Sequence, residues 1–236
     1  EKLVDQKFSI TSVKTGERRK NPQPPFTTSN LQQEAVRKLS FTTKKTMQIA
    51  QMLYEGVDIE GEGTVGLISY IRTDSTRLSD EALTAARDYI SANFAPEYLP
   101  ETPNIYKGRK NAQDAHEAIR PTHALFSPEK VKASLTRDQY RLYKLIYDRY
   151  LASQMTPAVY DTLAVELGSG EAQFRFGGMK KKFAGFTVLY EESQDEPAEK
   201  ESNLPKVQVG DQVTMKELDA EQHFTQTPAR YTEASL

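Results

Sequence analysis

The chain has 236 residues, of which 37% are hydrophobic and 27% are charged, and it contains no cysteine and no tryptophan. This length suits one or two domains, and the lack of cysteine excludes disulfides and thiolate metal sites. The net charge of −2 decides nothing about nucleic acid, because much of the acidity lies in one linker-like stretch, EESQDEPAEKES at 191–202.

The sequence predicts neither a membrane-spanning helix nor a signal peptide. No apolar run approaches the ~20 residues that a membrane-spanning helix needs. The first residues, EKLVDQKFSI, are charged and lack the apolar centre of a signal peptide. We therefore expect a cytoplasmic protein that makes no contact with a membrane.

The first zone, residues 1–27, contains one expected strand, KFSITSV, in which Phe8, Ile10 and Val13 supply the apolar positions. The stretch NPQPPF then breaks any regular structure. A single strand cannot form a stable sheet by itself, so we expect this one to pair with strands elsewhere in the chain.

The second zone, residues 28–155, has helical periodicity and several capping signals. Ser29 has capping-box spacing to a glutamine, Ser79 precedes two acidic residues, Ser127 precedes a proline, and Thr136 opens a second capping box. Gly56 is placed to end a helix. The helix after Thr136 is expected to be the longest, and its stripe of tyrosines favours a role in the core over a surface for stacking nucleic acid.

The third zone, from residue 156, alternates with a period of two, which is typical of strands. The candidates are AVYDTLAVEL, AQFRF, FAGFTVLYE, VQVGDQVTMKEL and EQHFTQ. The last residues, 231–236, look like the start of another helix that is cut off, which suggests an excised fragment. The order strand, helices, strands predicts a multidomain α and β protein in which a mostly helical domain, 28–155, is inserted into a mainly β domain, 1–27 plus 156–230.

The most informative motif is GLISYIRTDSTRLS at 66–79. If its first half is extended, Tyr70 and Arg72 point to the same face, so a phenol and a guanidinium could meet one phosphate. Asp74 and Ser75 would add an acceptor and a hydroxyl. A nearby cation would favour the nucleophilic phenolate. Spacing alone also fits a purely structural tyrosine, and this alternative stays open.

A second motif is AQDAHEAIRPTH at 112–123. On a helix, His116 and Arg120 would lie one turn apart and could hold an anion, whereas the plain alternative is a short surface helix ended by Pro121. The histidines and Glu117 lack a recognised metal-ligand spacing, so we expect no metal site.

Taken together, the motifs resemble those of the bacterial type IA DNA topoisomerases, on the topoisomerase I branch. The matching segments are PPFTTSNLQQEA, KKTMQIAQMLYEG, GLISYIRTDSTRLS, AHEAIRPT, YLASQMTPAVYDT and HFTQTPARYTEASL. They follow the family order from residue 24 to residue 236. No single segment is specific for this family, but the combination of all six in this order is.

The resemblance implies a role for each residue of the first motif. Tyr70 matches the nucleophile that forms a 5′-phosphotyrosine link to one DNA strand, and Arg72 matches the arginine that contacts the scissile phosphate. Thr73, Asp74 and Ser75 would belong to the same DNA-binding site.

The second motif carries further implied roles. His116 matches the active-site histidine, while Glu117 and Arg120 would order the site or bind DNA. The helical domain would carry the catalytic tyrosine, and the β domain would be a distorted sandwich or arch that hinges it.

The resemblance also implies what lies outside this chain. The full-length enzyme would bind Mg²⁺ through an N-terminal toprim domain, and the toprim and gate domains of the same chain would be missing here. We therefore expect a monomer whose full-length form relaxes negatively supercoiled DNA without a nucleotide cofactor, and an isolated fragment that is inactive and binds no metal.

Other functions remain possible from the sequence. They are a non-catalytic module that binds single-stranded nucleic acid, another phosphoryl-transfer enzyme such as a nuclease or recombinase, and a structural protein-binding domain. Within the family, topoisomerase III and reverse gyrase are the nearer alternatives.

Overall fold

The structure is a computed structural model that describes residues 7–106, 116–170, 172–193 and 202–234, apart from positions 218, 220, 226, 228 and 229. The chain divides into two compact units. The β unit comprises Glu1–Lys20, Ala158–Ala184 and Glu196–Arg230, and the helical unit comprises Asn21–Pro157, Gly185–Asp195 and Tyr231–Leu236. Most of the acidic stretch at 191–202 lies outside the described residues.

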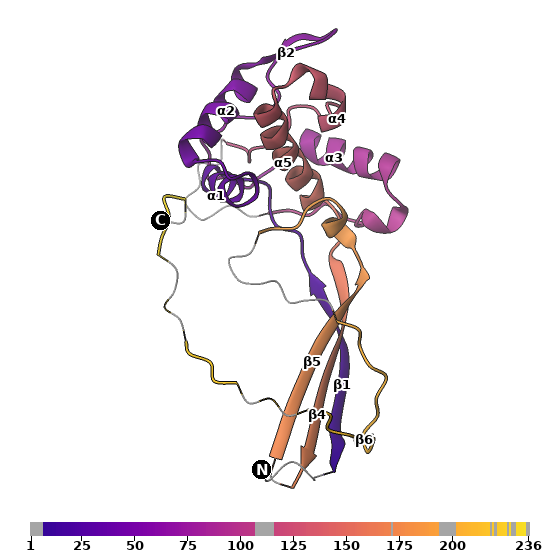
Figure 1. Ribbon diagram of the computed structural model, residues 1–236. Helices are drawn as coiled ribbons and strands as arrows, with labels where there is room; N and C mark the ends of the chain where they lie inside the picture. Colours follow the sequence, from indigo (N-terminus) through magenta and orange to yellow (C-terminus); the bar gives the residue numbers. More distant parts are fainter. Residues whose placement is uncertain are drawn as a thin grey trace. The chain divides into compact units, whose positions relative to one another are not determined.

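The β unit is built on one antiparallel sheet with the strand order β5-β4-β1-β6. Its strands are β1 (Phe8–Lys20), β4 (Ala158–Ser169), β5 (Ala172–Phe183) and β6 (Gln212–Val213), and the three long ones lie side by side in Figure 1. The register joins residues far apart in sequence, since Val13 lies opposite Val165. The expected pairing of the first strand with the third zone is therefore confirmed.

The core of the β unit lies on one face of this sheet. Ile10, Leu163 and Val165 are buried there, and Leu204 and Val207 pack against them from the segment that follows β5. The period-two alternation of the strands explains this one-sided core. The described residues contain this single four-stranded sheet, so the mixed α and β fold is confirmed, while the sandwich or arch stays a prediction.

Three of the expected strands are wrong or shortened. Gly185–Val188 within FAGFTVLYE forms a 3₁₀ helix, η3, VQVGDQVTMKEL yields only β6, and residues 221–225 of EQHFTQ have no regular structure. At Gly185, φ is 49° and a Cβ atom would lie 2.4 Å from the carbonyl oxygen of Pro157. This glycine turns the chain tightly, where a continued strand was expected.

The helical unit contains five α-helices and a small hairpin among the described residues. The helices are α1 (Thr28–Leu39), α2 (Thr43–Glu55), α3 (Asp80–Asn93), α4 (Pro128–Val131) and α5 (Arg137–Ser153). The hairpin joins β2 (Val57–Ile59) to β3 (Gly63–Val65), and short 3₁₀ turns occur at Pro96–Tyr98 and Lys132–Ser134. Figure 1 shows the helices gathered around α5. No helix among the described residues is both long and apolar enough to cross a membrane.

Side-chain caps fix where most of these helices begin. Ser79 caps α3, Ser127 caps α4, and Thr136 forms a full capping box at α5, all as predicted. The prediction for α1 was wrong, because Thr27 and not Ser29 accepts the backbone N–H of the first turn. Both residues carry a hydroxyl suited to capping, so composition could not separate them.

The tyrosines of α5 form much of the core of the helical unit. Tyr143, Tyr147 and Tyr150 are buried, and each hydroxyl donates to a backbone carbonyl. Burial raises the pKa of Tyr150 to about 12, so its hydroxyl stays protonated and serves as a donor. The predicted core role is confirmed for these three. Tyr140 differs, since its hydroxyl donates to the exposed Glu129.

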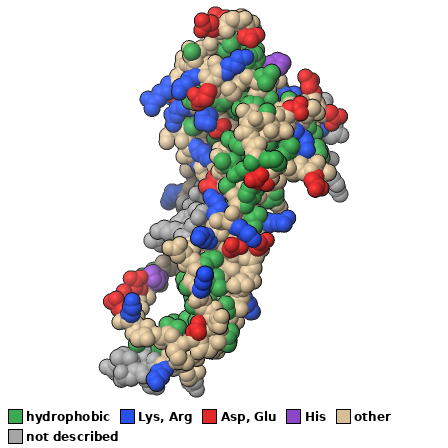
Figure 2. Space-filling model, turned by 90° about the vertical axis from the view of Figure 1, so that its right-hand side faces the viewer, with side chains coloured by type: hydrophobic (Ala, Val, Ile, Leu, Met, Phe, Trp, Pro, Cys, Tyr) green, Lys and Arg blue, Asp and Glu red, His purple; other side chains and the backbone are tan. Residues whose placement is uncertain are grey.

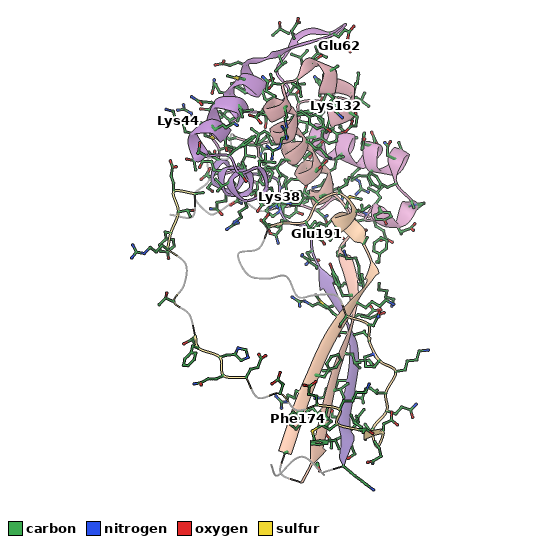
Figure 3. The ribbon with its side chains drawn as sticks, in the orientation of Figure 1. Lys38, Lys44, Glu62, Lys132, Phe174 and Glu191 are labelled. Carbon is green, nitrogen blue, oxygen red and sulfur yellow. The ribbon has the colours of Figure 1, made fainter. Side chains whose placement is uncertain are left out.

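The segment after η3 packs on α1, although it was expected in the β domain. The Tyr190 hydroxyl donates to the buried carboxylate of Glu34 over 2.6 Å, and Lys38 donates to the carbonyl of Glu191, close to it in Figure 3. Arg149 of α5 is also buried, 3.4 Å from Glu192. The contacts of Tyr190 with Glu34 and of Lys38 with Glu191 join residues more than a hundred positions apart, so local sequence pattern could not predict them.

Candidate functional site

The segment 66–79 joins β3 to α3 and exposes alternate side chains. Tyr70, Arg72 and Asp74 are exposed, and Tyr70 reaches 42% exposure. Thr73 and Ser75 are buried between them. The segment is not a regular strand, because it contains only one isolated bridge and bends at positions 71 and 72. The alternation nevertheless leaves the phenol, the guanidinium and the carboxylate on the solvent side.

Thr28, the first residue of α1, is hydrogen-bonded to the backbone of this segment. Its hydroxyl accepts the N–H of Thr73 over 2.9 Å and donates to the carbonyl of Ile71 over 2.8 Å. Its own N–H donates to the Thr73 carbonyl over 2.9 Å. One threonine therefore fixes the backbone on both sides of Arg72.

The hydroxyls of Thr73 and Ser75 shape the chain and do not face solvent. Thr73 accepts the N–H of Ser75 over 3.0 Å, and Ser75 accepts the N–H of Arg77 over 3.2 Å. Such short-range bonds are typical of a turn that leads into a helix. Of the three polar residues that follow Arg72, only Asp74 presents its side chain outward.

The second motif is not a helix. Residues 116–122 run extended beside the first motif, with isolated bridges at Ile119 and Pro121. Ser69 ties the two together, because its hydroxyl donates to the carbonyl of Ala118 over 2.7 Å and accepts the N–H of Arg120 over 3.0 Å. The expected helical turn between His116 and Arg120 is therefore wrong, since these backbone groups bond to another segment of the chain. Residues 112–115 lie outside the described residues.

The extended path still brings His116 to Tyr70. Their ring centroids are 5.4 Å apart with the planes tilted by 48°. On α2, the ring of Tyr54 lies 5.7 Å from that of Tyr70 at 68°, an edge-to-face contact. The sequence motifs gave no role in the site to Tyr54 or Ser69.

Glu117 and Arg120 pair with each other beside this cluster. Arg120 donates to one carboxylate oxygen of Glu117 through Nε over 2.9 Å and through Nη2 over 2.6 Å. Burial acts to raise the pKa of Glu117, but interactions with Ser79 and Arg120 outweigh it, so this pKa lies below the ordinary value. The charge of Arg120 is therefore largely engaged within the protein.

The candidate site offers no place for a metal among the residues that the structure describes, since no group of three or more His, Asp or Glu side chains gathers there. On the face drawn in Figure 2, basic and acidic side chains are mixed over the helical unit. The site offers two exposed phenols, Tyr70 and Tyr54, the exposed guanidinium of Arg72 and the imidazole of His116, on a backbone held by hydrogen bonds to Thr28 and Ser69. This set suits a reaction at a phosphate.

The bonds of Thr28 lead to a prediction about stability. Thr28→Val removes the hydroxyl but keeps the side-chain shape, and we expect it to lower the free energy of unfolding by about 1–3 kcal/mol, because the Thr73 N–H loses its acceptor. Urea denaturation followed by circular dichroism at 222 nm measures this. Thr84→Val is the matched control, because it removes an exposed hydroxyl that is hydrogen-bonded within α3. It should change the free energy of unfolding by less than about 0.5 kcal/mol. Equal losses in both variants would contradict this role of Thr28.

Two comparisons with known proteins point to one family. A family model described as DNA topoisomerase matches residues 1–236. The structure of full-length topoisomerase I from Thermotoga maritima, in a monoclinic crystal form, is similar with a TM-score of 0.75 and 36% sequence identity. The match covers 90% of this chain and 33% of that one, so the chain spans about a third of the length of this relative.

Proposed function

The chain belongs to the type IA DNA topoisomerase family, and we propose that it supplies the nucleophile, Tyr70, to an enzyme that relaxes negatively supercoiled DNA. One observation carries the proposal. Of the two exposed tyrosines of the site, Tyr70 is the one whose ring contacts His116 and which has the exposed Arg72 two positions away. The tyrosines in the core of α5 instead bury their hydroxyls.

The proposed reaction exchanges one phosphodiester bond for another. The phenolic oxygen of Tyr70 attacks phosphorus and forms a new P–O bond, while the bond from phosphorus to the 3′ oxygen of the preceding nucleotide breaks. The phenol loses one proton and the released 3′ oxygen gains one, so the step is balanced. Attack by that 3′ hydroxyl on the phosphotyrosine reseals the strand. Because the ester bond is conserved, no nucleotide cofactor is needed.

The other residues of the site take roles that follow from their positions. The guanidinium of Arg72 would bind the scissile phosphate and stabilise the charge that grows on its oxygens. His116 would orient the Tyr70 ring or exchange a proton near the phosphate. Thr73, Ser75, Glu117 and Arg120 would hold the two motifs in register, and Asp74 would face the bound strand.

The direction of the covalent link can be tested with labelled oligonucleotides and the complete enzyme. A 5′-phosphotyrosine link joins the protein to the downstream fragment, so a label at the 3′ end of a single-stranded substrate should move with the protein on a denaturing gel. A label at the 5′ end should appear only on free DNA. Transfer of the 5′ label instead would contradict the proposed chemistry.

The family resemblance implies a Mg²⁺ requirement for the complete enzyme. No group of three or more His, Asp or Glu side chains occurs among the described residues, and we derive no step through the metal. Incubated with supercoiled plasmid and Mg²⁺, the isolated 236-residue chain is expected to leave the plasmid supercoiled on an agarose gel, whereas the complete enzyme relaxes it. Relaxation by the isolated chain that disappears in Tyr70→Phe would contradict this expectation.

A further inference from the structure

The ring of Tyr54 packs edge-to-face against the ring of Tyr70, with 5.7 Å between the centroids. We propose that Tyr54 is a positioning residue that holds the Tyr70 phenol in the orientation needed for attack on phosphorus. This inference rests on the proposed function of Tyr70. In this proposal the Tyr54 ring orients the Tyr70 ring by packing against it, and Tyr54 takes no part in the chemical step.

The backbone fixes the place of Tyr54. It lies in the last turn of α2, and Gly56, with φ of 133°, ends that helix. The N–H of Leu67 donates to the carbonyl of Leu53 over 2.8 Å. At Gly66, a Cβ atom would lie 2.7 Å from the carbonyl oxygen of Tyr54. Glycine therefore lets the segment that carries Tyr70 approach the end of α2 closely, and the two rings meet as a result.

Tyr70 needs a packing partner that restricts its rotamers, because its side chain is 42% exposed. An exposed tyrosine can occupy several staggered rotamers, and each unproductive rotamer reduces the fraction of the enzyme ready for in-line attack. His116 contacts the same ring at 5.4 Å. With Tyr54 and His116 both in contact, the Tyr70 ring is limited to a narrow range of orientations.

The ring of Tyr54 carries this contact. Among the residues that the structure describes, the Tyr54 hydroxyl has no hydrogen-bond partner. Phenylalanine at this position should therefore preserve the function, whereas a residue without an aromatic ring should not. This difference between Tyr54→Phe and Tyr54→Leu separates a ring contact from a role of the hydroxyl in proton transfer.

The test uses the complete enzyme and a 3′-labelled single-stranded oligonucleotide under single-turnover conditions, with enzyme in excess. We expect Tyr54→Leu to lower the rate constant of covalent adduct formation by about 3- to 10-fold, the range for loss of one aromatic pair, with the Kd for DNA unchanged within about twofold. Tyr54→Phe should restore the rate. Tyr98→Leu, which removes a similar aromatic contact with Phe94, is the matched control and should keep it.

Three outcomes would overturn the proposal. They are an unchanged rate in Tyr54→Leu, a loss that Tyr54→Phe fails to restore, and a weaker Kd with an unchanged rate at saturating DNA, which would make Tyr54 a DNA contact. Tyr70→Phe, measured in parallel, reports on the nucleophile itself. If that variant still forms the adduct, the proposed function fails whatever Tyr54 does.

Discussion

Tyr70→Phe in the complete enzyme is expected to abolish formation of the covalent DNA adduct, lowering its rate by a factor on the order of 10⁴ or more. The substitution removes only the oxygen that would attack phosphorus. The aromatic contacts with Tyr54 and His116 do not involve that oxygen and should persist. The loss should therefore appear in the chemical step, with DNA affinity and the free energy of unfolding nearly unchanged.

The adduct is measured by transfer of a 3′ label to the protein after denaturation, and the DNA affinity by fluorescence anisotropy of a labelled oligonucleotide. Tyr98→Phe is the control, because it removes one phenolic oxygen at a partly buried position outside the site. Adduct formation by Tyr70→Phe at the normal rate would show that the nucleophile is another residue. A parallel fall in both variants would indicate a general loss of folding.

Local sequence pattern predicted those elements whose signals are themselves local. The caps at Ser79 and Thr136, the helix end at Gly56 and the tyrosine stripe of α5 all depend on residues within a few positions of one another. Period-two alternation predicted β4 and the first parts of β1 and β5, but the polar remainders of β1 and β5, residues 14–20 and 177–183, were not predicted as strand. The pairing of β1 with β4 followed from the instability of a lone strand.

The errors arose where distant residues decide the structure. His116 and Arg120 have helical spacing, yet the backbone between them bonds to Ser69. Gly185 lies within a strand-like pattern, yet the close approach of Pro157 turns the chain there. The packing of Tyr190 on Glu34 likewise has no local signal. In each case a tertiary contact outweighs the local preference.

In the candidate site, too, local pattern predicted some features and distant contacts decided others. Spacing brought Tyr70 and Arg72 to attention, but spacing could not distinguish a nucleophile from a structural tyrosine, and the assignment came from the resemblance to a family. The structure adds the alternation of exposure around Arg72 and the frame that Thr28 and Ser69 provide. Sequence alone could not reveal that frame, because Thr28 and Ser69 are ordinary residues until the segments lie side by side.

Arg72→Ala is expected to lower the rate of adduct formation in the complete enzyme by about 10²–10³-fold, the range for removing one preorganised donor to a developing charge. The side chain is exposed, and among the residues that the structure describes it forms no ion pair. Its guanidinium is therefore available for a phosphate. Arg72→Lys keeps the charge without the planar fork, so it should recover only part of the rate.

The matched control is Arg77→Ala, which removes another exposed arginine from the same segment. Arg77 contributes its backbone carbonyl to the N–H of Ala118, and alanine retains that carbonyl. We therefore expect a rate within about threefold of the unmodified enzyme, because any contact of the Arg77 side chain with DNA would be general and screened by salt. Single-turnover rates at saturating DNA separate the two effects. If Arg72→Ala weakened only the DNA affinity and kept the rate, or if both variants lost the rate equally, Arg72 would not act on the scissile phosphate.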